Sequence, residues 1–212
     1  MAVELLDVTQ PGLIRGQAHL SRDPKKLYFY VEHPTEGWRV YLRGACFIHE
    51  EGQPFDPSRF LVVKRTEADP LSKSWEAPKG QMEGKDGMRH PRSHIYKLIQ
   101  ENVRREVFEE AHIGILHGLR HTGLVFQGRE ADYPPNTFFQ YHIFQALTPA
   151  KAIQRALNWF AWLKNHPKFF LRMKHDKKEK DDIRWFDPRE TKLMGKWSPS
   201  LTAIYIKGFT LA

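Results

Sequence analysis

The chain has 212 residues, of which 41% are hydrophobic and 27% charged, so its composition predicts an ordinary globular core in one domain with additions. Its single cysteine, Cys46, excludes an intramolecular disulfide and a cysteine-rich zinc site. The first four residues lack the pattern of a signal peptide, and no apolar run approaches the roughly 20 residues that span a membrane. We therefore expect an intracellular, cytoplasmic protein with no membrane partner.

The first third of the chain predicts strands joined by turns. Aromatic and β-branched residues indicate strands at 27–31, 40–48 and 60–64. Residues 50–58 hold one Gly and two Pro and indicate a turn, and residues 75–80 lead into a glycine-rich loop. We assign residues 1–35 to an N-terminal extension, which fits either an ordinary hairpin or a contact in a homodimer.

Residues 93–113 are predicted to form a helix. Apolar side chains recur there at every fourth residue and make one stripe: Ile95, Ile99, Val103, Val107 and Ala111. We expect Ser93 to cap the start of this helix and Gly114 to follow its end in the left-handed conformation.

The second half of the chain continues with strands at 119–127 and 138–146, a helix at 149–165, a strand at 183–186 and a helix from 198. In the strand at 138–146, apolar residues alternate with Gln140 and His142, which is typical of a half-buried strand. The order of elements predicts an α+β fold, an α/β/α sandwich in which helices flank a mixed central sheet.

The net charge of +8 is unevenly spread. Residues 164–180 hold seven Lys or Arg against Asp176 and Glu179, which is a surplus of five positive charges. A basic segment of this kind is either a solvated face or a surface that attracts phosphate groups, on a small nucleotide or on a polymer.

Three carboxylates gather near the end of the predicted helix. Glu106, Glu109 and Glu110 fall within an arc of about 100° on one side of a helix. Such crowding is either a solvated acidic face or a site for a hard cation such as Mg²⁺ or Mn²⁺, which prefers oxygen ligands. Arg105 is four residues before Glu109 and can hold that carboxylate by an ion pair.

The motif around these carboxylates resembles the Nudix hydrolase family, whose signature is G-x5-E-x7-R-E-U-x-E-E-x-G-U, where U is a bulky aliphatic residue. Residues 105–111 (REVFEEA) match its second half, and Ile113 stands at the final aliphatic position. Residues 80–86 resemble the first half, with Asp86 at the Glu position, and the preceding WEAPKG segment is similar to the family's strand before the loop. The resemblance covers residues 36–207 and implies a Nudix domain over 36–212.

The chain departs from that signature in two places. Eighteen residues separate Asp86 from Arg105 where the family has seven, and His112 replaces the usual glycine. We therefore expect insertions at about 87–97 and at 149–180.

The resemblance implies a metal-dependent hydrolase. Glu106, Glu109 and Glu110 would bind Mg²⁺ or Mn²⁺ with the backbone carbonyl of Gly80, and Glu110 would act as the general base with Arg105 and Glu109 beside it. Reserve candidates for a further ligand or base are Glu130, Asp132, Glu179 and Asp182. The predicted substrate-binding residues are Lys79, Glu76, Glu83, Phe126 and Tyr141.

The expected reaction is hydrolysis of a phosphoanhydride bond in a nucleoside diphosphate-linked small molecule, such as ADP-ribose or a dinucleoside polyphosphate. Two alternatives remain open. The basic residues at 164–180 favour an RNA partner with a capped or 5′-polyphosphorylated end. A Nudix fold can also serve as a nucleotide-sensing module without catalysis.

Overall fold

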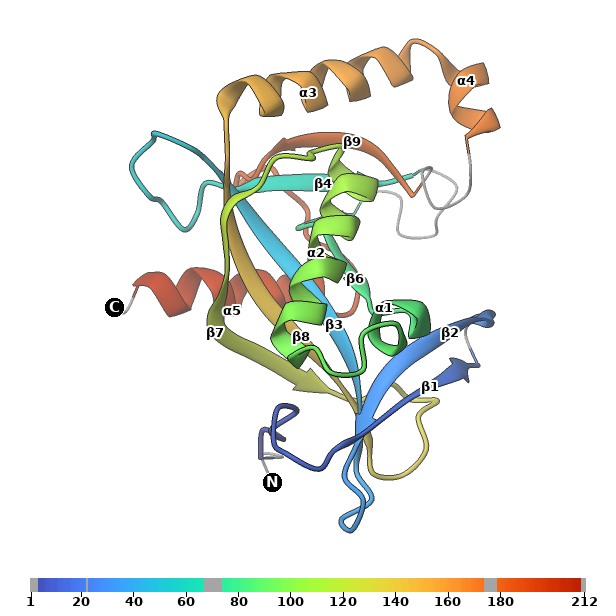
Figure 1. Cartoon of the computed structure of the whole chain (residues 1–212). Helices are drawn as coiled ribbons and strands as arrows, with labels where there is room; N and C mark the ends of the chain where they lie inside the picture. Colours follow the sequence, from blue (N-terminus) through green and yellow to red (C-terminus); the bar gives the residue numbers. More distant parts are fainter. Residues whose placement is uncertain (1–3, 22, 67–73, 174–178, 211–212) are drawn as a thin grey trace.

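The computed structural model describes residues 4–21, 23–66, 74–173 and 179–210 (Figure 1). The larger of its two sheets has the spatial order β1-β2-β3-β8-β7, with β6 paired beside β3. Its strands are β1 (Ile14–Leu20), β2 (Asp23–Glu32), β3 (Arg39–Glu50), β6 (Lys79–Gln81), β7 (His117–Gly128) and β8 (Thr137–Thr148). β3 and β8 run parallel and the other pairs antiparallel, so the sheet is mixed, as predicted.

The smaller sheet has three antiparallel strands in the order β5-β4-β9. They are β4 (Leu61–Arg65), β5 (Trp75–Glu76) and β9 (Lys180–Trp185). Because β5 and β6 are separated by two residues, the short link between them ties the two sheets together beside the end of α2.

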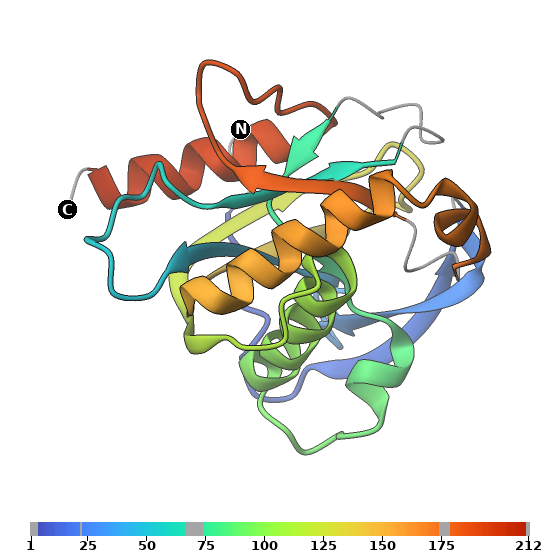
Figure 2. The same ribbon diagram turned by 90° about the horizontal axis from the view of Figure 1, so that it is seen from above.

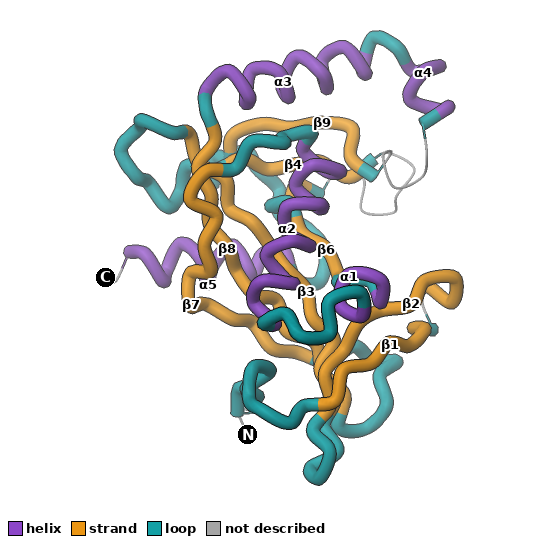
Figure 3. Tube along the Cα trace, viewed as in Figure 1, coloured by secondary structure: helices purple, strands orange, loops and turns teal. Residues whose placement is uncertain are grey.

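The helices are α1 (Gly84–Met88), α2 (Ile95–Ala111), α3 (Ala150–Lys164), α4 (Pro167–Arg172) and α5 (Ser198–Thr210). α2 covers one face of the larger sheet and α5 lies on the other, while α3 lies over β9 as an outer layer (Figures 2 and 3). This arrangement confirms the predicted α/β/α sandwich.

Successive side chains of β3 point to opposite faces of the sheet, so they belong to two separate apolar cores. Val40 and Leu42 belong to the core shared with α2, whereas Tyr41 and Phe47 belong to the core shared with α5. The predicted stripe of α2 supplies the first core, and all five of its side chains are buried.

The prediction of a half-buried strand at 138–146 is wrong. β8 is buried along nearly its whole length because it lies between β3 and β7 with a helix on each side. Gln140 is paired inside the protein: its side-chain amide donates to the Leu6 carbonyl at 2.7 Å and to Gln127 Oε1 at 2.8 Å.

Both predicted caps of α2 are also wrong. His94 is the N-cap, and its ring Nδ1 accepts the backbone N–H of Tyr96 at 3.3 Å. At the other end His112, with φ 55°, takes the left-handed position and Gly114 does not. The chain turns one residue after Ala111 because Ile113, which is almost fully buried, must point back into the core.

α1 and α4 were not predicted, and for residues 1–35 the sequence allowed either a hairpin or a dimer contact. β1 and β2 form a hairpin whose second strand pairs with β3, so the hairpin continues the larger sheet. Within the described part of the chain, no helix is both long and apolar enough to cross a membrane.

Candidate functional site

The carboxylates of α2 reach the short strand β6. Gly80 of β6 pairs with Gly44 of β3, and a Cβ built at Gly80 would lie only 2.0 Å from the carboxyl carbon of Glu106. Any side chain at position 80 would therefore displace Glu106. The close approach puts this carboxylate against the backbone of β6, as the predicted role of Gly80 requires.

Arg105, Glu106 and Glu109 form what we call the cleft cluster. The Arg105 guanidinium lies 2.8 Å from carboxylate oxygens of both Glu106 and Glu109, and 3.2 Å from Asp86. It also donates to Asn102 Oδ1 at 2.8 Å. The expected ion pair between Arg105 and Glu109 is thus present, as one contact of a wider network.

Glu76, Lys180 and Glu110 form what we call the buried cluster. The Lys180 ammonium contacts a carboxylate oxygen of Glu76 and lies 2.8 Å from Glu110 Oε1. The backbone N–H of Lys79 donates to the other oxygen of Glu110 at 2.9 Å. All three side chains of this cluster are buried.

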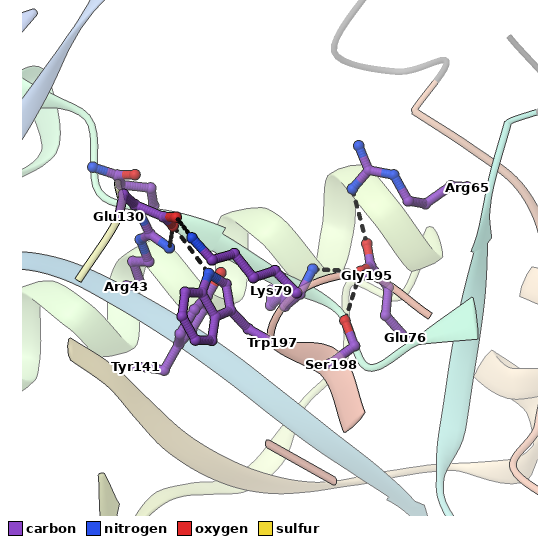
Figure 4. A pocket seen from close by; sticks show the side chains of 11 residues that line it. Arg43, Arg65, Glu76, Lys79, Glu130, Tyr141, Gly195, Trp197 and Ser198 are labelled. Carbon is purple, nitrogen blue, oxygen red and sulfur yellow. Dashed lines mark hydrogen bonds and ion pairs between the residues drawn. The ribbon is translucent and has the colours of Figure 1, made fainter. Parts of the chain in front are cut away.

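The second oxygen of Glu76 has partners of its own (Figure 4). It lies 2.5 Å from the Lys79 ammonium and accepts the Ser198 hydroxyl at 3.0 Å. Figure 4 also shows Arg65 reaching toward Glu76, at 3.4 Å from its first oxygen. Glu76, predicted to bind substrate, is therefore committed to contacts within the protein.

The two clusters differ in how their carboxyl groups ionise. Burial alone would raise the pKa of Glu76, but the Lys180 and Lys79 ammonium groups outweigh it and hold that pKa well below its usual range. Burial raises the pKa of Glu110, which shares Lys180 with Glu76. In the cleft cluster, burial raises the pKa of Glu106 to about 8 against the opposing effect of Arg105. Burial therefore favours the neutral form of the Glu106 carboxyl group even beside Arg105.

A cleft of about 370 Å³ opens beside the cleft cluster. Its lining includes the acidic residues Glu106, Glu109 and Glu110 and the basic residues Lys79, Arg65 and Lys26. Glu83 and Gly80 line it too, as does Glu179, one of the reserve candidates. The cleft thus brings together carboxylates that suit a cation and basic groups that suit a phosphate.

A second cavity, of about 300 Å³, adjoins this cleft and shares Arg65, Lys79 and Gln81 with it. Tyr141 and Trp197 supply its aromatic surface (Figure 4). Glu130 is fixed in its wall, accepting from Arg43 at 3.1 Å and from the Trp197 ring N–H at 2.9 Å. These contacts hold the pKa of Glu130 at about 2 although burial opposes them, so this carboxylate is ionised.

The remaining predicted residues lie elsewhere. Phe126 packs against Trp197, with ring centroids 5.4 Å apart, and lines neither of the two cavities. Asp132 bonds Ser21, and Asp182 pairs with Lys164 at 2.7 Å. Of the basic stretch, Lys174, Lys177 and Lys178 lie outside the described residues.

Sequence patterns missed Arg65, Lys180 and Trp197. Lys180 is counted with the basic stretch in the sequence, yet it is 3% exposed and belongs to the buried cluster. A single Lys in a charged segment carries no signal of burial. Only the pairing of β9 with β4, which sets Lys180 opposite Arg65, places it near Glu110.

The cleft suits a divalent cation in the chemistry of its donors. Glu106 and Glu109 are hard oxygen ligands, and a bound cation would favour the ionised form of Glu106. Within the described residues, however, no three His, Cys, Asp or Glu side chains are grouped so that they could hold a metal ion. Instead, Arg105 is bound to Glu106 and Glu109, and Lys180 is bound to Glu110.

No protein-family model matches the chain, and no curated protein matches it. Solved structures similar to it include a NUDIX hydrolase from Nitrosomonas europaea, 15% identical, with a TM-score of 0.45 over 80% of this chain and 90% of that one. The NUDIX domain of Shewanella oneidensis NrtR complexed with ADP ribose is 13% identical, with a TM-score of 0.46 over 82% and 88% of the two chains. A mutT/nudix family protein from Listeria innocua is 16% identical, with a TM-score of 0.43 over 81% and 93%. At such values, what those proteins bind says nothing by itself about this chain.

Proposed function

We propose that this protein is a Nudix-type hydrolase that cuts a phosphoanhydride bond in a nucleoside diphosphate-linked small molecule, such as ADP-ribose or a dinucleoside polyphosphate. The observation that carries the proposal is the cleft that Glu106 and Glu109 line together with Lys79 and Arg65. The REVFEEA motif at 105–111 supports the proposal from the sequence alone, because Glu106 and Glu109 belong to that motif.

In this proposal Glu106 and Glu109, with the carbonyl of Gly80, hold Mg²⁺ or Mn²⁺. A bound divalent cation neutralises phosphate oxygens and makes a bound water more acidic. Arg105 positions both carboxylates, and Lys79 and Arg65 bind a substrate phosphate. Glu109, the more exposed of the two carboxylates, is the one we assign to proton transfer from the attacking water.

Glu110 has a different place in the proposal from the one that the motif alone implies. Its carboxylate is bound to Lys180 and to the Lys79 amide, so it holds the loop between β5 and β6 against α2. Glu110 would act as a metal ligand or base only if its carboxylate released Lys180 and bound the cation instead.

The nucleoside of the substrate would occupy the adjoining cavity. Tyr141 and Trp197 offer ring surfaces to a base, and ligand sites of about 300 Å³ or more are the usual size in proteins. Because Lys79 and Arg65 line both cavities, they would contact the diphosphate at the point where the two meet.

The test is a hydrolysis screen with Mg²⁺ and Mn²⁺ over ADP-ribose, diadenosine polyphosphates, nucleoside triphosphates and a short capped RNA. Glu109→Gln should abolish turnover of the active substrate and leave folding intact. Glu101→Gln is the matched control, because Glu101 is an exposed glutamate on the same helix that lines a different cavity. Equal turnover by both variants would refute the assignment of the site.

The Lys180–Glu110 ion pair favours a second candidate, a nucleotide-sensing module without catalysis, because it withdraws one motif carboxylate from metal binding. In that case, isothermal titration would detect binding of one of the nucleotides while the screen found no hydrolysis with either metal. Glu109→Gln would then leave that binding unchanged.

A further inference from the structure

A second surface, separate from the cleft, lies on α3 and α4 and borders the turn that follows α2 (Figures 1 and 2). We name it the α3–α4 surface. It consists of Arg155, Trp159, Trp162, Lys168, Phe169 and Arg172.

The charge of this surface is of one sign. α3 and α4 together carry five Lys or Arg and no Asp or Glu, and all five cations are exposed. Among the described residues only one of the five, Lys164, is in an ion pair, with Asp182. Uncompensated cations along two successive helices attract a polyanion.

Aromatic rings stand between these cations. The Trp162 ring is stacked with Trp159, with ring centroids 5.4 Å apart, and with His166, at 4.1 Å. Phe169 meets Trp162 edge-on at 4.9 Å and is more exposed than Trp162, at 46% against 38%. Exposed rings interleaved with cations are the arrangement on which unpaired nucleobases stack.

A hollow of about 540 Å³ continues this surface between α3 and the turn after α2. Arg155 and Trp159 line it from α3, and His112 and Ile115 from the turn. The Trp159 ring N–H is buried and has no acceptor among the described residues. A planar base, with acceptor atoms on its edge, suits a hollow of this kind better than a lipid surface does, because a bilayer requires a protruding apolar face.

We propose that the α3–α4 surface binds single-stranded RNA. Arg155, Lys168 and Arg172 contact the phosphates, and unpaired bases stack on Phe169 and enter the hollow beside Trp159. RNA carries such unpaired bases in its loops and at its ends. This binding is distinct from the proposed hydrolysis and does not depend on it.

The first test is fluorescence anisotropy of a labelled oligouridine of about 12 nucleotides, a length within the usual site sizes, titrated at several salt concentrations. Arg155→Ala/Lys168→Ala/Arg172→Ala should weaken binding at least about tenfold and reduce the slope of log K against log salt by about 2, since each phosphate contact on a single strand contributes about 0.7. The matched control Arg189→Ala/Lys192→Ala/Lys207→Ala removes three exposed cations from outside this surface and should keep the slope.

The second test separates stacking from charge. Phe169→Ala should weaken binding by about fivefold or more at an unchanged salt slope, because one stacked base is lost, and Phe169→Trp should keep most of the affinity. Far-UV circular dichroism and thermal unfolding verify that every variant is folded.

Several results would overturn the proposal. They are an absence of RNA binding at low salt, equal losses in the two triple variants, or affinity for duplex RNA or single-stranded DNA as high as for single-stranded RNA. Binding to phosphatidylserine vesicles without binding to RNA, lost in the same triple variant, would assign the surface to a membrane instead.

Discussion

The cleft cluster and the buried cluster meet at the end of α2, which supplies Glu106 and Glu109 to one and Glu110 to the other, but their surroundings differ. In the buried cluster, Lys180 satisfies Glu110 and Glu76, and no side chain is open to solvent. In the cleft cluster, one guanidinium serves Glu106 and Glu109 beside an open cleft, and the pKa of Glu106 is raised to about 8 by burial. Glu110 lines the same cleft, so the glutamates of this motif differ in their ionic partners and not in their access to the cleft.

A buried carboxylate whose ionic partners are all present contributes to the stability of the fold. Loss of one partner leaves an uncompensated buried charge. A carboxylate that lines a cleft with incomplete compensation contributes little to stability and is free to bind a cation. The following experiments test whether the two clusters differ in this way.

The largest effect is expected for Lys180→Met. It leaves Glu76 and Glu110 buried without their shared cation, and breaking a buried ion pair costs about 3–5 kcal/mol. Urea denaturation monitored by tryptophan fluorescence measures the loss. If Lys180→Met/Glu110→Gln is no more stable than Lys180→Met, the buried cluster is not a coupled unit.

The two adjacent glutamates should respond differently to the same change. Glu110→Gln should lower the free energy of unfolding by about 1.5–3 kcal/mol, because a hydrogen bond to a charged group is lost. Glu109→Gln, whose side chain is 29% exposed, should change it by less than about 0.5 kcal/mol. Similar values for both variants in the same urea titration would remove the distinction between the clusters.

The buried cluster should also be sensitive to acid. The pKa of Glu76 is lower in the folded protein than the 4.5 of the free side chain, so its stabilisation is complete above pH 4.5 and is lost as the pH falls further. Between pH 7 and 3.5 the wild-type protein should therefore lose about 1.4 kcal/mol more than Glu76→Gln. Buried His49 and His142 have lowered pKa values in both proteins and cancel in this difference.

Gly80→Ala tests the geometry of the cleft cluster. The added Cβ displaces the Glu106 carboxylate, so metal-dependent hydrolysis should fall at least tenfold with a stability loss of only about 1 kcal/mol. Gly44→Ala is the counterpart, because its Cβ would lie 2.3 Å from a Val103 methyl group and not near Glu106. It should lower stability by about 1–3 kcal/mol and leave the KM of the remaining folded enzyme unchanged.

The smallest effect is expected at the surface. Lys164→Met removes the ion pair with Asp182 at 2.7 Å, in which the Lys164 side chain is 54% exposed, and should change stability by less than about 0.5 kcal/mol. The same Lys-to-Met change thus measures burial directly. A loss near that of Lys180→Met would show that chemistry, rather than burial, sets the energy of these pairs.

The elements with strong periodicity could be predicted from the sequence. The helix predicted from apolar residues at every fourth position matches α2 within a few residues, and the strand predicted from β-branched residues matches β4 as closely. α4 was missed because it has only six residues and therefore carries no periodic signal. The end of α2 was predicted at the wrong residue because it is set by the burial of Ile113, and capping preferences consider only the residues at the helix end.

The sequence by itself determined the α/β/α class and placed three glutamates on one side of α2, because helical geometry relates near neighbours whatever surrounds them. It also identified Gly80 and Lys79 as neighbours of the carboxylates, through the motif that they share. Only the tertiary structure decided that Glu110, which lines the same cleft as Glu106 and Glu109, pairs with Lys180. That decision rests on the pairing of β9 with β4, a contact between residues more than a hundred positions apart, and burial of this kind leaves no local trace in the sequence.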